Sequence, residues 1–156
     1  MREKLRILVI CQHNSGRSQI AEAYLQQLMG DAAIVESAGL EPAAAIDPLI
    51  VKAMAEEGID ISGKRPEDVF DKFKTGVFYA HVITVCDDSE SKCPIFPGFA
   101  TRWHRPFPNP TELRGTDEER LNGIRLIRGQ IKAWLTNPPT GEFSYRQVLD
   151  DVGGAP

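Results

Sequence analysis

The sequence has few cysteines and no long hydrophobic run. Its three cysteines, Cys11, Cys86 and Cys93, are too few for a disulfide-stapled fold and include no C-x-x-C pair. The three histidines show no H-x3-H spacing, so a structural zinc site is not expected. No apolar run reaches the roughly 18 residues of a membrane-spanning helix, and the N-terminus lacks the apolar segment of a signal peptide. These absences predict a cytoplasmic protein that does not cross a membrane.

Positive charge is also not in excess. Eighteen Lys and Arg against 22 Asp and Glu give a net charge of −4, so no overall attraction to nucleic acid or to an anionic membrane is expected. Any anion site must therefore be built locally. With 156 residues, of which 42% are hydrophobic, the chain is long enough to bury one sizeable core.

Short apolar segments alternate with amphipathic ones along the chain. The branched apolar run 5–10 is typical of a strand buried on both faces, as in a parallel sheet. Two further strands are expected at 33–37 and 81–85, and helices at 18–29, 48–57, 66–73 and 117–136. This alternation predicts an α/β fold with a mostly parallel sheet.

Local signals fix several boundaries. Asp47 before Pro48 predicts a capped helix start, and Thr116 with Glu119 forms a capping box before an apolar stripe that ends at Trp134. In the helix that begins near Pro66, the side chains of Val69, Phe70 and Phe73 are expected to face inward. The proline-rich segment 86–110 is expected to be a functional loop. Residues 1–136 form the expected domain, and residues 137–156 a tail of undetermined order.

The end of the first strand carries the clearest chemical signal. Cys11 follows that strand, and a short loop then leads to Arg17 at the start of a helix. Amides at a helix N-terminus bind oxyanions and favour a thiolate, while a guanidinium holds two oxygens of one anion. Ser18 is a candidate hydrogen-bond donor to the thiolate. The candidate oxyanion-binding residues are Gln12, His13, Asn14, Ser15, Gly16 and Arg17. The alternative is an inert buried thiol beside a surface arginine.

The segment CQHNSGRSQIAEAYL, which begins at Cys11, resembles the C-x5-R-S signature of the low-molecular-weight protein tyrosine phosphatase superfamily. With the S-A-G segment at 37–39 and the V-x6-C-P segment at 85–94, it resembles more closely the thioredoxin-coupled arsenate reductases of that fold. The resemblance covers about residues 4–136. It implies a three-layer sandwich around a central, mostly parallel four-stranded sheet.

The resemblance also implies a three-thiol relay. Cys11 attacks arsenate to form a thiol-arsenate adduct, and Cys86 attacks the Cys11 sulfur, releasing arsenite and leaving a disulfide. Cys93 then exchanges with Cys86 and presents a disulfide to a dithiol reductant such as thioredoxin. No tightly bound cofactor is implied. A regulatory disulfide that protects Cys11 from oxidation is an alternative role for the second and third cysteines.

One position departs from the superfamily pattern. Asn109-Pro110 stands where an Asp-Pro pair supplies a general acid, and an amide cannot transfer a proton as a carboxylic acid does. Either the enzyme is slow, or His104, Asp87 or Asp88 replaces the acid, or Asn109 only positions the oxyanion. We favour a reaction with reduced dependence on the acid.

Some arsenate reductases of the superfamily bind potassium beside the loop. Asn14, Glu22 and Ser37 match that site, while Glu67 stands where Asp is expected and Arg65 would repel a cation. Asn14 and Glu22 equally suit a role as hydrogen-bonding braces of the loop. No metal is therefore expected.

Three functions remain after these steps. The favoured one is reduction of arsenate, which requires all three cysteines. The alternative is hydrolysis of a phosphomonoester, which requires only Cys11 and Arg17. The third is capture of an oxyanion without turnover, which the asparagine at position 109 suggests.

Overall fold

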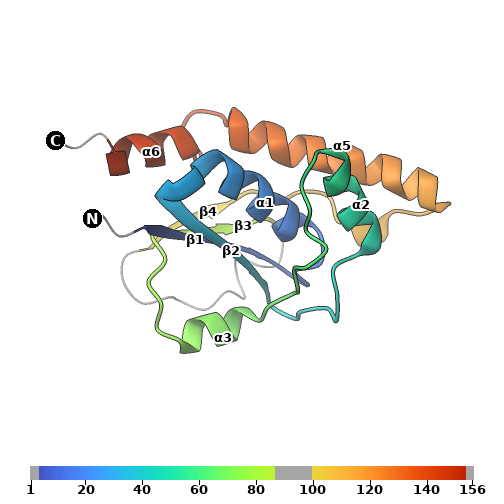
Figure 1. Ribbon diagram of the computed structural model, residues 1–156, viewed down its shortest axis with the longest axis horizontal. Coiled ribbons are helices and arrows are strands. Elements are labelled where there is room, and N and C mark those ends of the chain that lie inside the picture. Colours follow the sequence, from blue (N-terminus) through green and yellow to red (C-terminus); the bar gives the residue numbers. More distant parts are fainter. Residues whose placement is uncertain (1–3, 87–99, 154–156) are drawn as a thin grey trace.

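The computed structural model describes residues 4–86 and 100–153 (Figure 1). Within these ranges, helices follow β1, β2 and β4, and two of the described helices are short 3₁₀ helices. The strands are β1 (Leu5–Cys11), β2 (Ala33–Gly39), β3 (His81–Thr84) and β4 (Thr101–His104). The helices are α1 (Arg17–Met29), η1 (Gly30–Ala32), α2 (Pro48–Glu56), α3 (Val69–Lys74), η2 (Pro110–Glu112), α5 (Asp117–Thr136) and α6 (Tyr145–Gly153).

The four strands form one parallel sheet in the order β2-β1-β3-β4. The predicted α/β class with a four-stranded parallel sheet is confirmed. Cys11 pairs with Gly39 at the end of the β1–β2 ladder, and the Val85 amide just beyond β3 donates to the Ile10 carbonyl. The carboxyl ends of β1 and β3 therefore lie side by side, with Cys11 as the last residue of β1 and Cys86 two residues beyond β3.

Alternate residues of β1 face two apolar layers. Ile7 and Val9 pack into the larger core with residues of α1, α2, α5 and α6, whereas Leu8 and Ile10 pack into a smaller cluster with Val69 of α3. In Figure 1 the large helices lie on one side of the sheet and α3 on the other. The sheet is thus the middle of three layers, which explains why β1 is apolar at every position from Ile7 to Ile10.

Two helices begin where the sequence signals place them. The Asp47 carboxylate accepts a hydrogen bond from the Leu49 amide at the start of α2, with Pro48 at the first helical position. Thr116 and Glu119 form the predicted capping box at the start of α5. The apolar stripe of α5 is buried, and it consists of Leu121, Ile124, Ile127, Ile131 and Trp134.

Two expectations about local structure are wrong. Residues 101–104, expected to lie in a loop, form the edge strand β4, whose side chains are mostly exposed and so carry no continuous apolar pattern. In α3 only Val69 is buried, whereas Phe70 and Phe73 are each 41% exposed. A helix of six residues is too short for its periodicity to define a buried face reliably.

Residues beyond position 136 also contribute to the larger core. Phe143 and Val148 are buried there, and Tyr145 packs against it. The Phe143 ring meets the rings of Trp103 and Trp134, and α6 lies beside α1. Within residues 4–86 and 100–153, no helix combines the length and the apolar character needed to cross a membrane.

Candidate active site

The loop 12–16 joins the end of β1 to the start of α1, and its carbonyl groups point toward the segment that follows β2. The carbonyls of Cys11, Gln12 and His13 accept hydrogen bonds from the amides of Leu40, Glu41 and Ala43, at 3.1, 2.8 and 3.0 Å. Because each peptide's amide points opposite to its carbonyl, this arrangement turns the amides that follow these carbonyls toward the other side of the loop.

Gly39 allows the loop to take this path, and Gly16 ends the loop at the start of α1. A Cβ atom on Gly39 would lie 2.9 Å from the Asn14 amide nitrogen and from the Gln12 carbonyl oxygen, so β2 must carry glycine here. Gly16 is the N-cap of α1, and no side chain caps the helix. The first amides of α1 are therefore open to an anion, as the sequence predicts.

Cys11 is buried and its sulfur receives two polar contacts. The Asn14 amide nitrogen lies 3.3 Å from Sγ, and the Ser18 hydroxyl oxygen lies 2.9 Å from it. Asn14 adopts a left-handed conformation, with φ of 53°, which brings its amide back toward the sulfur. Both contacts can donate to a thiolate, because the Ser18 oxygen itself accepts a hydrogen bond from Asn14 Nδ2 and keeps its own proton free.

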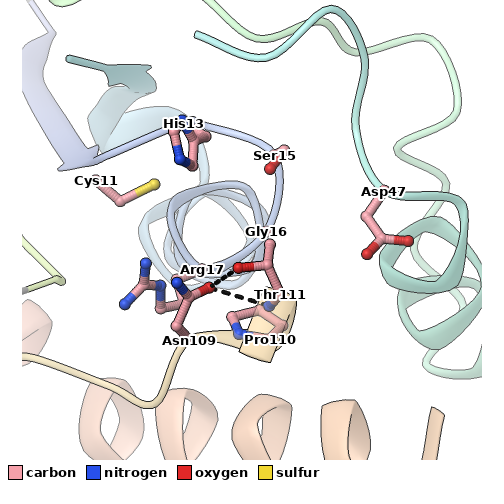
Figure 2. A pocket seen from close by; sticks show the side chains of 9 residues that line it. All are labelled: Cys11, His13, Ser15, Gly16, Arg17, Asp47, Asn109, Pro110 and Thr111. Atoms are coloured by element: carbon pink, nitrogen blue, oxygen red, sulfur yellow. Dashed lines mark hydrogen bonds between the residues drawn. The ribbon is translucent and has the colours of Figure 1, made fainter. Parts of the chain in front are cut away.

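Arg17 is buried and anchored from the opposite side of the site. Its Nη1 donates to the Phe107 carbonyl oxygen at 3.0 Å, which fixes the guanidinium plane. The remaining guanidinium hydrogens are available to an oxyanion. Figure 2 shows the side chains around a pocket that contains the Cys11 sulfur. This Cys11 pocket is lined by Cys11, His13, Ser15, Gly16, Arg17, Asp47, Asn109, Pro110 and Thr111.

The orientation of the Asn109 amide is determined by Thr111. Asn109 Oδ1 accepts hydrogen bonds from the Thr111 amide at 3.0 Å and from the Thr111 hydroxyl at 2.8 Å. A backbone amide only donates, so the atom facing Thr111 must be the amide oxygen. The Asn109 NH2 group is thereby directed away from Thr111, and Figure 2 shows this side chain beside Arg17.

Cys86 lies beyond β3 and is buried in a second cavity of about 270 Å³. This Cys86 cavity is lined by Gln12, Arg17, Cys86, Phe107, Pro108, Asn109 and Glu112. It therefore shares Arg17 and Asn109 with the Cys11 pocket. No disulfide joins Cys11 to Cys86.

The remaining predicted site residues are the third cysteine and the candidate replacements for the general acid. Cys93, Asp87 and Asp88 lie outside the described residues. His104 Nδ1 is 2.6 Å from the Thr84 hydroxyl, and His104 lines neither the Cys11 pocket nor the Cys86 cavity. Glu112, which no sequence motif marks, does line the Cys86 cavity.

Three of the four potassium candidates lie together. Asn14, Ser37 and Glu22 are buried and joined by hydrogen bonds, whereas the Glu67 carboxylate pairs with Lys72 at 3.0 Å and sends only its backbone amide to Asn14. Lys64 forms an ion pair with Glu22. Among the residues that the structure describes, no cluster of three His, Cys, Asp or Glu side chains is suited to a metal ion.

Sequence reasoning missed three contributors to the site. Asp47 lines the Cys11 pocket in addition to capping α2, Thr111 orients Asn109, and the Phe107 carbonyl anchors Arg17. The last two sit in or just after the proline-rich segment, where no periodicity marks them. The glycine at position 16 is one sequence feature that reflects the segment facing the loop. The Pro110 ring packs over Gly16 at a distance that leaves little room for a Cβ atom.

This chain resembles known proteins in sequence and in fold. The family model for low molecular weight phosphotyrosine protein phosphatase matches residues 6–104. An arsenate reductase of Bacillus subtilis is 38% identical over 125 residues, which cover 80% of this chain and 88% of that protein.

Solved structures with the same architecture include a thioredoxin-dependent arsenate reductase of Corynebacterium glutamicum, with 33% identity and a TM-score of 0.56. That match covers 83% of this chain and 59% of the longer one. A tyrosine phosphatase of Erwinia amylovora matches with a TM-score of 0.69 at 13% identity, over 97% of this chain and 95% of its own, which shows the shared fold alone.

Proposed function

Because this chain belongs to the low molecular weight phosphotyrosine protein phosphatase family, we propose that it uses that family's anion site to reduce arsenate to arsenite. One observation carries the proposal. Cys11 and Cys86 lie at the carboxyl ends of the neighbouring parallel strands β1 and β3. Cys11 lines one pocket and Cys86 lines a second cavity, and Arg17 and Asn109 line both. A phosphatase needs one nucleophilic sulfur, whereas a two-electron reduction needs a second thiol within reach of the first.

The first step forms a bond between sulfur and arsenic. The Cys11 thiolate attacks dihydrogen arsenate, one proton is taken up, and water leaves, so that a singly charged thiol-arsenate adduct remains on Cys11 with arsenic still pentavalent. Arg17 and the amides of the loop bind the oxygens that stay on arsenic. Ser18 and the Asn14 amide donate hydrogen bonds to the sulfur before the attack.

The second step transfers the electrons. The Cys86 thiolate attacks the Cys11 sulfur, the sulfur–arsenic bond breaks, and its electron pair stays on arsenic. Two protons convert the leaving group to neutral arsenous acid, and the two sulfurs form a disulfide. Arsenic gains two electrons and the two thiols lose two, so no bound cofactor is required.

The third step restores Cys11. Cys93 attacks Cys86 by thiol-disulfide exchange, and the resulting disulfide is reduced by an external dithiol. Support for this role comes from the spacing of Cys86 and Cys93 in the sequence and from the thioredoxin dependence named for the Corynebacterium relative. Thioredoxin is accordingly the proposed reductant.

Asn109 binds the oxyanion in this proposal and transfers no proton. Its NH2 group is the only part of the side chain left to face the site, because Thr111 engages the amide oxygen twice. An amide donor suits a substrate whose leaving oxygen is a small hydroxyl that solvent can protonate. It suits poorly an ester, whose alkoxide needs a nearby acid.

Hydrolysis of a phosphomonoester is the second candidate. Cys11, Arg17 and the loop suffice for attack on phosphorus, and the shared fold with a tyrosine phosphatase is consistent with it. The amide at position 109 argues for a low rate in that reaction.

The test is arsenate-dependent oxidation of NADPH in the presence of thioredoxin and thioredoxin reductase. The wild-type protein should turn over, and Cys86→Ser and Cys93→Ser should each lose multiple turnover by at least about 100-fold, because neither can regenerate Cys11. Phosphate binding to both variants, measured by calorimetry, should stay at the wild-type level. Unimpaired turnover in either variant would refute the relay, and a wild-type protein that hydrolyses p-nitrophenyl phosphate but ignores arsenate would establish the second candidate.

A further inference from the structure

A buried carboxylate lies behind the loop 12–16 and has one charged partner. Glu22, in α1, has a side chain that is only 6% exposed, and its Oε2 pairs with the ammonium group of Lys64, which is 49% exposed. Its Oε1 accepts a hydrogen bond from the Ser37 hydroxyl at 2.9 Å. Because a buried charge is costly unless it is paired, Lys64 stabilises the Glu22 carboxylate in this position.

The contacts continue from Glu22 to the nucleophile. Asn14 Nδ2 donates to the Ser37 hydroxyl at 2.9 Å and to the Ser18 hydroxyl at 2.7 Å, and Ser18 Oγ lies 2.9 Å from the Cys11 sulfur. Ser37 must use its own proton on Glu22, so its oxygen is free to accept from Asn14. Because the Glu22 carboxylate accepts the Ser37 proton, it determines that Asn14 donates to Ser37 and not the reverse.

Asn14 is the residue that this chain of contacts holds in place. Both hydrogens of its NH2 group are engaged, and its Oδ1 accepts from the Glu67 amide at 2.9 Å and from Gln19 Nε2 at 3.1 Å. A left-handed backbone conformation is unfavourable for a residue other than glycine, and surrounding contacts must maintain it. That conformation aims the Asn14 amide at the Cys11 sulfur.

We propose that Lys64 is a positioning residue for the Cys11 nucleophile, acting through Glu22, Ser37 and Asn14. Without the ammonium group, the buried Glu22 carboxylate loses its charged partner and turns toward solvent. Ser37 then loses the acceptor of its proton, and its oxygen is no longer fixed as the acceptor for Asn14 Nδ2. The proposal rests on the proposed function only in treating Cys11 as the nucleophile, and it does not depend on arsenate being the substrate.

The experiment measures the alkylation rate of Cys11 by iodoacetamide, resolved by peptide mass spectrometry, with Cys86 in the same sample as an internal reference. Lys64→Met should lower the Cys11 rate by about tenfold, in line with coupling through neighbouring hydrogen-bonded groups, and Lys64→Arg should restore most of it. Lys132→Met is the matched control, since Lys132 pairs with Glu57 on the surface and is similarly exposed. It should leave the Cys11 rate unchanged.

A double variant separates positioning from a general loss of stability. In Lys64→Met/Glu22→Gln no charge is left buried, so its Cys11 rate should equal that of Glu22→Gln alone if Lys64 acts through Glu22. A wild-type rate in Lys64→Met, an equal loss in Lys132→Met, or additive losses in the double variant would each overturn the proposal. The readout needs no arsenate, so absence of arsenate turnover in the wild type would refute the proposed function while leaving this inference standing.

Discussion

The two segments that face each other across the Cys11 pocket are built in different ways. The loop 12–16 is held by bonds from elsewhere in the chain, from the backbone after β2 and from buried side chains behind it. The segment 107–112 satisfies its hydrogen bonds largely within itself, as in the pairs between Asn109 and Thr111 and between the Glu112 amide and the Asn109 carbonyl.

This difference suggests two separate roles: the loop 12–16 binds the anion, and the segment 107–112 helps to decide which reaction the bound anion undergoes. In the proposed mechanism, the loop presents amides and Arg17 to any tetrahedral oxyanion, and its shape is imposed by the strands and helices around it. In the proposed mechanism, the facing segment and Cys86 determine the fate of the covalent adduct, because they supply the group near the leaving oxygen and the second thiol. Changes to the loop should therefore abolish every activity, whereas changes to the facing segment should shift the balance between activities.

The largest effect is expected from Gly39→Ala, which tests how rigidly the loop is held. The new Cβ atom would meet backbone atoms of Gln12, His13 and Asn14 at 2.9 Å, and none of these can move without distorting the loop. Arsenate turnover and phosphate affinity should both fall, turnover by at least about 100-fold, since a displacement near 1 Å has that cost. Gly63→Ala, where nothing lies within 4 Å, is the control. Wild-type turnover in Gly39→Ala would show that the loop is adaptable.

The sequence predicts the loop better than the segment that faces it. A buried strand, a cysteine, small residues and an arginine at a helix start are local features, and Cys11, Arg17 and Ser18 lie together at the loop that these features predict. The charged partner of Glu22 is 42 residues away, in an exposed stretch with no pattern, so the Lys64 pair was not predictable. The edge strand β4 and the bond from Arg17 to Phe107 likewise depend on contacts between distant parts of the chain.

A smaller and selective effect is expected from Asn109→Asp. A carboxylic acid at this position should raise the hydrolysis of p-nitrophenyl phosphate by about 100-fold, the usual contribution of a general acid, and change arsenate reduction by less than about threefold. Because only the protonated acid helps, the gain should disappear as the pH rises through the pKa of the new carboxyl group. Steady-state rates across pH measure both. Asn122→Asp on the exposed face of α5 is the matched control.

Both outcomes of the Asn109→Asp experiment bear on the difference between the loop and the facing segment. A selective gain in hydrolysis would show that the facing segment sets the reaction without altering anion binding. If both rates stay unchanged, the leaving oxygen receives its proton from elsewhere, and Asn109 has no part in selecting the substrate.

The smallest effect is expected outside both segments, at His81, and it concerns stability alone. Burial lowers the pKa of His81 below 6.5, and the charge of Asp151 opposes this only in part. The unfolded chain therefore binds more protons than the folded one below about pH 6.5, so the free energy of unfolding should decrease as the pH falls through that region. His81→Gln keeps an acceptor for Trp103 Nε1 but removes the titration, and its melting temperature should fall less between about pH 7 and pH 5.

Arsenate turnover at pH 7 should match the wild type, since His81 begins β3 at the end of the sheet opposite Cys86. An equal acid sensitivity in the two proteins would assign the loss of stability to other groups, and a loss of turnover would show that the packing beneath α6 reaches the site.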